Sequence, residues 1–188
     1  MALLLAPCAQ AADPATAANP PIPSLLQEME GSWTVAEKMW PGGGQIEAVD
    51  LPAAVAHRRL IRQSYLEEVM ESVPADAKDA FNRTSYFAFN ATSHKFEYFS
   101  IDSRLPQMMN ERSAVMGSSL PSDGWVKLEG NHFVAPSWGK AQNVPFRYRL
   151  AVGAVRSDRQ VVQLFLTPES GKDRKEFLAF EYIYVRAP

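Results

Sequence analysis

The stretch Ser24-Leu-Leu-Gln-Glu-Met-Glu-Gly31-Ser-Trp33 decides the fold of this chain. Gln27 follows Ser24 at the spacing of a capping box, which favours the start of a helix at Ser24. The segment from Ser24 to Glu30 therefore predicts a short helical turn, and residues 32–40 form a strand-like run directly after it. Gly31 and Trp33 thus mark the point where a helix passes straight into the first strand.

The rest of the chain consists of strand-like runs separated by turn residues. The predicted strands cover residues 32–40, 45–50, 57–72, 81–90, 95–102, 108–116, 125–130, 131–138, 146–156, 160–167 and 177–186. Long helical periodicity is absent, so the chain is predicted to be all-β, with about ten strands joined by tight turns. Such a series favours an antiparallel up-and-down barrel, which removes exposed edges by closing. An immunoglobulin-type sandwich would need fewer, crossing strands and a cysteine or equivalent between its sheets.

Three motifs give the chain a resemblance to a known family. They are Leu25-x-x-x-Met29-x-Gly31-x-Trp33, the segment Phe99-Ser-Ile-Asp102-Ser103, and the ending Tyr182-Ile-Tyr184-Val-Arg186. From Leu25 to Arg186 the sequence resembles a bacterial lipocalin-like family of unknown function in the calycin superfamily. This resemblance implies that the helix closes one end of a lipocalin-like barrel and that Gly31, Trp33 and Arg186 are structural. It also implies that Arg186 stacks on the Trp33 indole, a cation–π contact worth roughly 1 kcal/mol.

The first residues predict export. Residues 1–11 form an apolar leader that ends in the A-x-A pattern Ala9-Gln10-Ala11, as a signal peptide does. The leader is short and has no basic residue, so either the true start lies upstream or the signal is weak. Residues 12–23 form an Ala- and Pro-rich linker, and residues 24–188 form the barrel domain. A lipid anchor on Cys8, the only cysteine, is the alternative that Pro7 disfavours, and a bacterial periplasmic or secreted location is expected.

Composition narrows the function further. The chain has 188 residues and a formal net charge of −2, with 19 basic and 21 acidic side chains. Nucleic-acid binding is not expected, because it would need a basic stripe. No apolar stretch after the leader approaches the length of a membrane-spanning helix.

The candidate ligand-binding residues lie in the strand-like runs. Arg147 and Arg149 alternate with Phe146, Tyr148 and Leu150, and an inward arginine would suit a ligand carboxylate. Tyr148 and Met108 are the other candidates, Met108 because methionine adapts to irregular apolar ligands. Surface ion pairs and core filling are the alternatives for these side chains. The inward face stays open at this point, because one residue of register exchanges lumen and exterior.

Catalytic, metal and cofactor sites are not predicted. His57, His94 and His132 lie in different runs and lack the close spacing of metal ligands. Asp102-Ser103 with His94 resembles a fragment of a catalytic triad, but an Asp-Ser pair after a strand is more typical of a turn.

These patterns predict non-catalytic binding of a small, mainly apolar ligand in the barrel. The alternative is an interaction module with a filled barrel that forms a homodimer through an outer apolar face, since both faces of residues 177–186 are largely apolar. A hydrolase acting at the barrel mouth is the third candidate.

Overall fold

The computed structural model describes residues 24–41, 47–76, 80–113, 124–138, 141–153, 158–170 and 174–188. One short helix precedes a series of strands, in agreement with the predicted all-β class. The elements are α1 (Ser24–Met29), β1 (Gly31–Met39), β2 (Val49–Asp50), β3 (Ala54–Ile61), β4 (Tyr65–Ser72), β5 (Asn82–Asn90), β6 (Lys95–Asp102), β7 (Leu105–Ser113), β8 (Val126–Trp138), β9 (Ala141–Gly153), β10 (Arg159–Pro168) and β11 (Phe177–Arg186).

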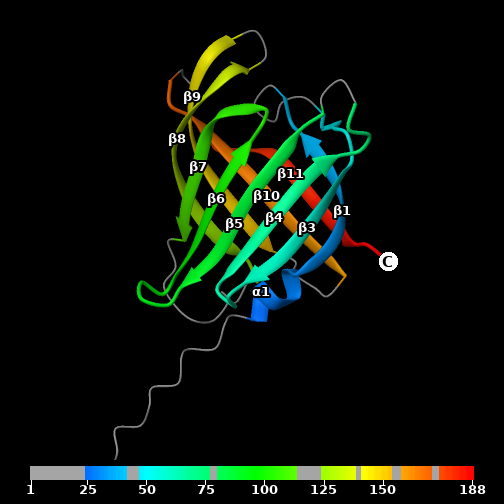
Figure 1. The fold of residues 1–188 in the computed structure, drawn as a ribbon. Helices are drawn as coiled ribbons and strands as arrows, with labels where there is room; N and C mark the ends of the chain where they lie inside the picture. Colours follow the sequence, from blue (N-terminus) through cyan, green and yellow to red (C-terminus); the bar gives the residue numbers. More distant parts are fainter. Residues whose placement is uncertain are drawn as a thin grey trace, which may run out of the picture.

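Ten of these strands form an antiparallel up-and-down barrel, as predicted. Each strand from β3 to β11 pairs with its neighbour in the chain, and β1 pairs with both β3 and β11. Pairing of β1 with β11 brings the two ends of the domain side by side, which Figure 1 shows in blue and red. The short strand β2 pairs only with the end of β1.

The barrel is nearly closed, with a short ladder between β7 and β8. Among the described residues this ladder has three pairs, which join Glu111–Ser113 to Leu128–Gly130. Beyond them β8 pairs only with β9, and their hairpin extends past the rest of the wall at the end remote from α1 (Figure 1). Residues of β7 and β8 at that end therefore flank a gap in the hydrogen-bonded wall.

Two predicted strand boundaries are wrong. Residues 57–72 form two strands, β3 and β4, joined by a tight turn in which Arg62 and Gln63 have φ values of 46° and 57°. These conformations usually call for Gly or Asn, so the sequence carried no turn signal here. Residues 125–138 form one strand instead of two, because a bulge between Glu129 and His132 lets β8 continue through Gly130 and Asn131.

Helix α1 closes one end of the barrel (Figure 1). Its apolar residues Leu25, Leu26 and Met29 are buried, and the indole of Trp33 is fully buried beside them. The Trp33 Nε1–H donates a hydrogen bond of 3.0 Å to the Met29 carbonyl at the end of the helix. The helix-to-strand junction is therefore held by the first aromatic residue of β1, as the resemblance implied.

Burial along the strands settles which face is inward. In β9 the residues Phe146, Tyr148 and Leu150 are buried, whereas Arg147 between them is exposed. Tyr182 and Tyr184 of β11 point into the barrel in the same way, and Val185 is exposed. Since successive strand residues alternate between faces, the lumen of every strand follows from these positions.

Candidate functional site

A cavity of about 580 Å³ occupies the half of the barrel remote from α1. Its walls include Met39 near the end of β1 and Phe180 near the start of β11, residues that are distant from the helix along both strands. Leu105 of β7 and Phe133 of β8 line it on either side of the weakly paired seam. The cavity therefore lies beside the gap between β7 and β8.

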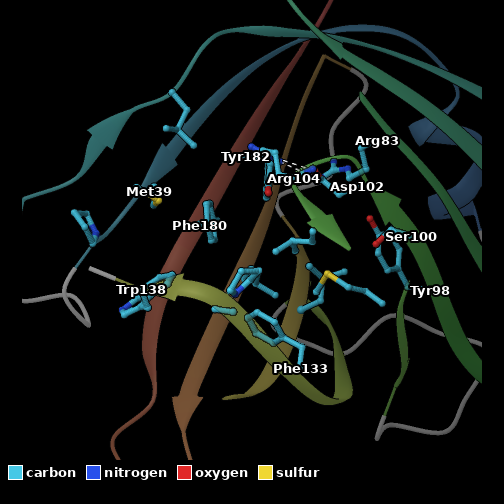
Figure 2. Close-up of a pocket in the computed structure, with 18 of the residues that line it drawn as sticks. Met39, Arg83, Tyr98, Ser100, Asp102, Arg104, Phe133, Trp138, Phe180 and Tyr182 are labelled. Atoms are coloured by element: carbon cyan, nitrogen blue, oxygen red, sulfur yellow. Dashed lines mark hydrogen bonds and ion pairs between the residues drawn. The ribbon is translucent and has the colours of Figure 1, made fainter. Parts of the chain in front are cut away.

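One side of the cavity is apolar and largely aromatic. Trp138 and Phe133 both pack against Phe146, with ring centroids 5.3 and 5.6 Å apart, so these rings support one another. Figure 2 shows Trp138, Phe180 and Met39 together on this side. Further apolar lining comes from Leu51, Leu105, Met109, Ala135, Leu150 and Leu164 and from three prolines, Pro41, Pro52 and Pro136. An apolar molecule would replace water against this wall at a favourable free energy.

The opposite side of the cavity is polar. Figure 2 shows Arg83, Tyr98, Ser100 and Asp102 on this side, and Arg104 also lines it. They come from β5, from β6 and from the turn between β6 and β7. The cavity is therefore amphipathic, with polar groups on one wall only.

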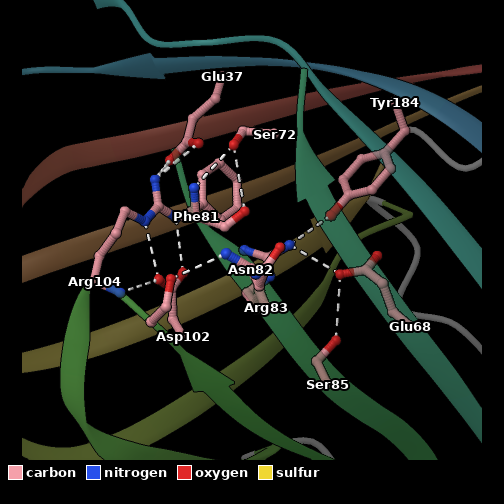
Figure 3. A network of polar contacts seen from close by, with 11 residues as sticks. Glu37, Glu68, Ser72, Phe81, Asn82, Arg83, Ser85, Asp102, Arg104 and Tyr184 are labelled. Carbon is pink, nitrogen blue, oxygen red and sulfur yellow. Dashed lines mark hydrogen bonds and ion pairs between the residues drawn. The ribbon is translucent and has the colours of Figure 1, made fainter. Parts of the chain in front are cut away.

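Arg104 holds two carboxylates at the outer part of the polar wall. Its Nη1 donates to both carboxylate oxygens of Glu37, at 2.9 and 3.0 Å. Its Nε and Nη2 donate to the two oxygens of Asp102, at 3.0 and 2.8 Å, and its guanidinium lies 3.7 Å from the centre of the Phe81 ring. Figure 3 shows Arg104 between the two acids. Because Glu37 lies in β1 and Asp102 ends β6, this arginine ties two distant strands together.

A second buried network lies between the cavity and α1. Glu68 accepts hydrogen bonds from Arg58 at 2.7 Å, from Arg83 at 2.9 Å and from Ser85 at 3.3 Å. Arg83 also donates to the Tyr184 hydroxyl at 2.9 Å (Figure 3), and Arg58 donates to Gln160. These charged side chains fill the lower lumen, and they are paired as buried charges must be.

The pKa values of Glu68 and Asp102 reflect the arginines that bind them. Burial alone would raise the pKa of Glu68, but the charges and hydrogen bonds of Arg58 and Arg83 outweigh it and lower the pKa to about 2. Asp102 is also partly desolvated, and hydrogen bonds from Arg104 nevertheless lower its pKa. Burial raises the pKa of Tyr182 and Tyr184, so both phenols stay protonated near neutral pH. The partners of Glu68 and Asp102 thus favour their ionised forms, and burial keeps the two phenols neutral.

Arg83 belongs to the second network, lies opposite Asp102 of the first network in the β5–β6 ladder, and has spare hydrogen-bonding capacity. It is 7% exposed, it lines the cavity, and its guanidinium lies 4.6 Å from the centre of the Tyr182 ring. Only Nη2 donates a hydrogen bond among the described residues, so Nη1 is available to a ligand, whereas Nε is buried out of reach of the cavity. The hydroxyl groups of Ser100 and Tyr182 also make no hydrogen bond within the described part of the chain. These groups can receive a ligand atom.

The two predicted ligand-binding arginines do not reach the cavity, which corrects their expected placement. Arg147 projects from the outer face and is 69% exposed, 4.0 Å from Glu169. Arg149 lies on the same face, where it pairs with Glu176 at 2.6 Å and covers the ring of Phe165. Both are surface ion pairs, the alternative that the sequence left open.

Of the other two candidates, Tyr148 faces the lumen and Met108 faces the exterior, and neither lines the cavity. Tyr148 faces inward and is buried against Phe133, but it does not line the cavity. Met108 is 69% exposed on the outer wall, and its neighbour Met109 is the methionine that lines the cavity. Sequence reasoning missed Arg58, Arg83 and Arg104, although Arg58 and Glu68 occupy inward positions between apolar neighbours in their strands.

The histidines lie apart. His57 contacts Ser32 at 3.0 Å on the outer face, His94 lies in the turn before β6, and His132 pairs with Glu169. Asp102 lies at the other end of β6 from His94, so Asp102, Ser103 and His94 do not form a catalytic triad. Asp102 and Ser103 accept hydrogen bonds from backbone amides in a turn, as the alternative predicted. The described residues contain no group of His, Cys, Asp and Glu side chains suited to a metal ion.

Barrel and cavity together define the class: a nearly closed, ten-stranded antiparallel β-barrel with an amphipathic lumen. Within that class the chain belongs to the family described as a protein of unknown function, DUF1579, whose model matches residues 22–183. None of the curated proteins compared with the chain matches it. Within the described residues, no helix has the length and apolar character needed to cross a membrane. The predicted leader, Cys8 and the whole linker lie outside the described residues.

Proposed function

We propose that this protein is a non-catalytic, lipocalin-like binding protein that holds a small, mainly apolar ligand inside its barrel. The amphipathic cavity carries the proposal. Its volume of about 580 Å³ falls within the range of roughly 300–1,000 Å³ that is typical of small-molecule sites. Its apolar wall suits a hydrocarbon or aromatic body, and its polar wall suits a single polar group.

A periplasmic or secreted location is part of the same proposal. It is supported by the apolar leader and the Ala9-Gln10-Ala11 pattern. A carrier for apolar molecules would be useful in that compartment, because such molecules dissolve poorly in water.

Filling the cavity tests the binding function. Ala135 lines the cavity and is 4% exposed, whereas the preceding residue, Val134, is 45% exposed on the outer face. Ala135→Trp should abolish binding of the neutral dye N-phenyl-naphthylamine, and Val134→Trp should leave it unchanged. If Ala135→Trp does not fold, Leu164→Trp replaces it, because Leu164 lines the cavity from β10, and it should also abolish dye binding. Equal dye binding by the wild type and by a folded cavity-filled variant would refute binding in the lumen.

An interaction module is the second candidate, favoured by one row of exposed side chains. Val69, Ile101 and Met108 are 38%, 50% and 69% exposed. They lie in one cross-strand row, with Thr84 between the first two. Exposed apolar rows of this kind occur at protein interfaces. Sedimentation of the wild type and of Ile101→Lys would detect a dimer that this row supports.

A further inference from the structure

The charge balance of the lumen restricts the kind of ligand that the cavity accepts. Among the described side chains, the buried networks contain the arginines Arg58, Arg83 and Arg104 and the carboxylates Glu37, Glu68 and Asp102. Their formal charges cancel, and each carboxylate is bound by at least one of the arginines. A buried charge without a partner is costly, so a ligand that brought a further charge would upset this balance.

The free donor at the cavity lies next to a carboxylate. Arg83 and Asp102 are directly opposed in the ladder between β5 and β6, and both line the cavity. The positive charge of Arg83 is already shared by Glu68 at 2.9 Å. An anionic head group placed at Arg83 would therefore meet the negative charge of Asp102 at close range. A neutral acceptor would meet the Nη1–H of Arg83, which donates no hydrogen bond to the described residues, without this repulsion.

We propose that the ligand carries an uncharged oxygen acceptor, such as the carbonyl of a ketone, ester or amide, and that Arg83 receives this oxygen. Tyr182, whose ring lies against the guanidinium, and Ser100 supply hydroxyl groups on the same wall. The apolar body of the ligand lies along Phe133, Trp138 and Phe180 on the opposite wall. This inference rests on the proposed binding function and adds the chemical class of the ligand.

A series of ligands with one tail and different head groups tests the assignment. Methyl nonyl ketone, the isosteric alkene in which a methylene replaces the carbonyl oxygen, and decanoate would each compete with N-phenyl-naphthylamine at neutral pH. The ketone should displace the dye at a concentration at least about tenfold lower than the alkene, since a hydrogen bond from a charged donor in a dry site is worth that much. Decanoate should be weaker than the ketone.

The Arg83→Lys variant assigns the effect to one side chain. Lysine keeps a positive charge near Glu68 but lacks the second guanidinium nitrogen that reaches the cavity, so the advantage of the ketone over the alkene should disappear while alkene binding persists. Arg149→Lys, on the outer face, is the matched control and should behave as the wild type. Tyr182→Phe, which removes only a hydroxyl, should reduce the same advantage if Arg83→Lys does not fold.

The outcomes separate the two proposals. Stronger binding of decanoate than of the ketone, or equal binding of ketone and alkene by the wild type, would overturn the neutral-acceptor assignment and leave the binding function intact. If neither the dye nor any ligand bound, the binding function itself would fail, and the assignment with it.

Discussion

The guanidinium of Arg186 lies 4.2 Å from the centre of the Trp33 ring, and the two residues are directly opposed in the ladder that closes the barrel. Arg186 also donates to the carbonyls of Glu30 and Glu28, at 2.8 and 2.9 Å. The last strand therefore binds both the first strand and the end of α1 through one side chain. This contact joins residues from the two ends of the domain.

Trp33→Ala should lower the free energy of unfolding by roughly 3–5 kcal/mol, because it removes a fully buried aromatic side chain. Arg186→Ala should cost less. Since the two side chains are in contact, the double variant should show a coupling energy in urea unfolding. Strictly additive losses would contradict a stabilising stack.

Gly31→Ala should destabilise the junction by about 1–3 kcal/mol, because Gly31 has a φ of 122° that other residues rarely adopt. An added Cβ would also lie 2.4 Å from Nη1 of Arg186. Gly124→Ala is the control, with a φ of 72° but nothing within 4 Å of the added atom. Thermal unfolding should show that Arg186→Ala relieves part of the Gly31→Ala loss, and an unchanged loss would refute the steric contribution.

Arg104→Ala should destabilise the barrel by roughly 3–5 kcal/mol, because it leaves the buried carboxylate of Glu37 without its partner. Arg149→Ala breaks a comparable pair with Glu176 at the surface and should cost at most about 1 kcal/mol. Denaturant unfolding of the two variants would measure the difference. A loss from Arg104→Ala as small as that from Arg149→Ala would show that Glu37 finds another partner.

Glu68 should make stability depend on pH in the acidic range. The pKa of Glu68 falls from 4.5 in the unfolded chain to about 2 in the folded protein. The ionised carboxylate therefore stabilises the fold fully at pH values above 4.5. That contribution, about 3 kcal/mol, is lost as the pH falls from about 4.5 towards 2. Glu68→Gln should be less stable at neutral pH and should lose less stability on acidification.

Asp102 also has a lowered pKa, so the Glu68→Gln variant should keep a residual slope of the same sign. Urea unfolding at a series of pH values would measure both slopes. Equal slopes for wild type and variant would show that Glu68 does not contribute as expected.

The exported protein should begin near Ala12 and should stay folded in reductant, since cleavage after Ala11 removes the only cysteine. Mass spectrometry of protein purified from its own host would identify the first residue. A lipid-modified Cys8 would instead establish a membrane anchor.

Much of the fold was predictable from local patterns. Short strand-like runs joined by tight turns predicted an antiparallel barrel, and the resemblance carried by the Gly31–Trp33 motif implied which end is closed. The turn at Arg62 and Gln63 was not predictable, because these residues adopt positive φ values without Gly or Asn. Cross-strand pairing of β3 with β4 along eight residue pairs offsets the local cost of that turn.

The candidate site was less predictable, although one signal was present. Glu68 lies two residues from both Leu66 and Met70 and shares their strand face, so an inward charge could have been suspected. Its partners Arg58 and Arg83 come from neighbouring strands, and Arg104 reaches Glu37 over 67 positions of sequence. Such pairings follow from register and barrel closure, which no local window contains.

By itself, the sequence determined the all-β class, the order of most strands and the short helix before the first strand, because strand periodicity, turn chemistry and capping act over a few residues. Only the tertiary structure decided which face of each strand is the lumen, since one residue of register exchanges the two faces. That choice placed Arg147 and Arg149 outside and Arg58, Arg83 and Arg104 inside. The chemistry of the cavity therefore depends on barrel closure, which fixes the register of all ten strands together.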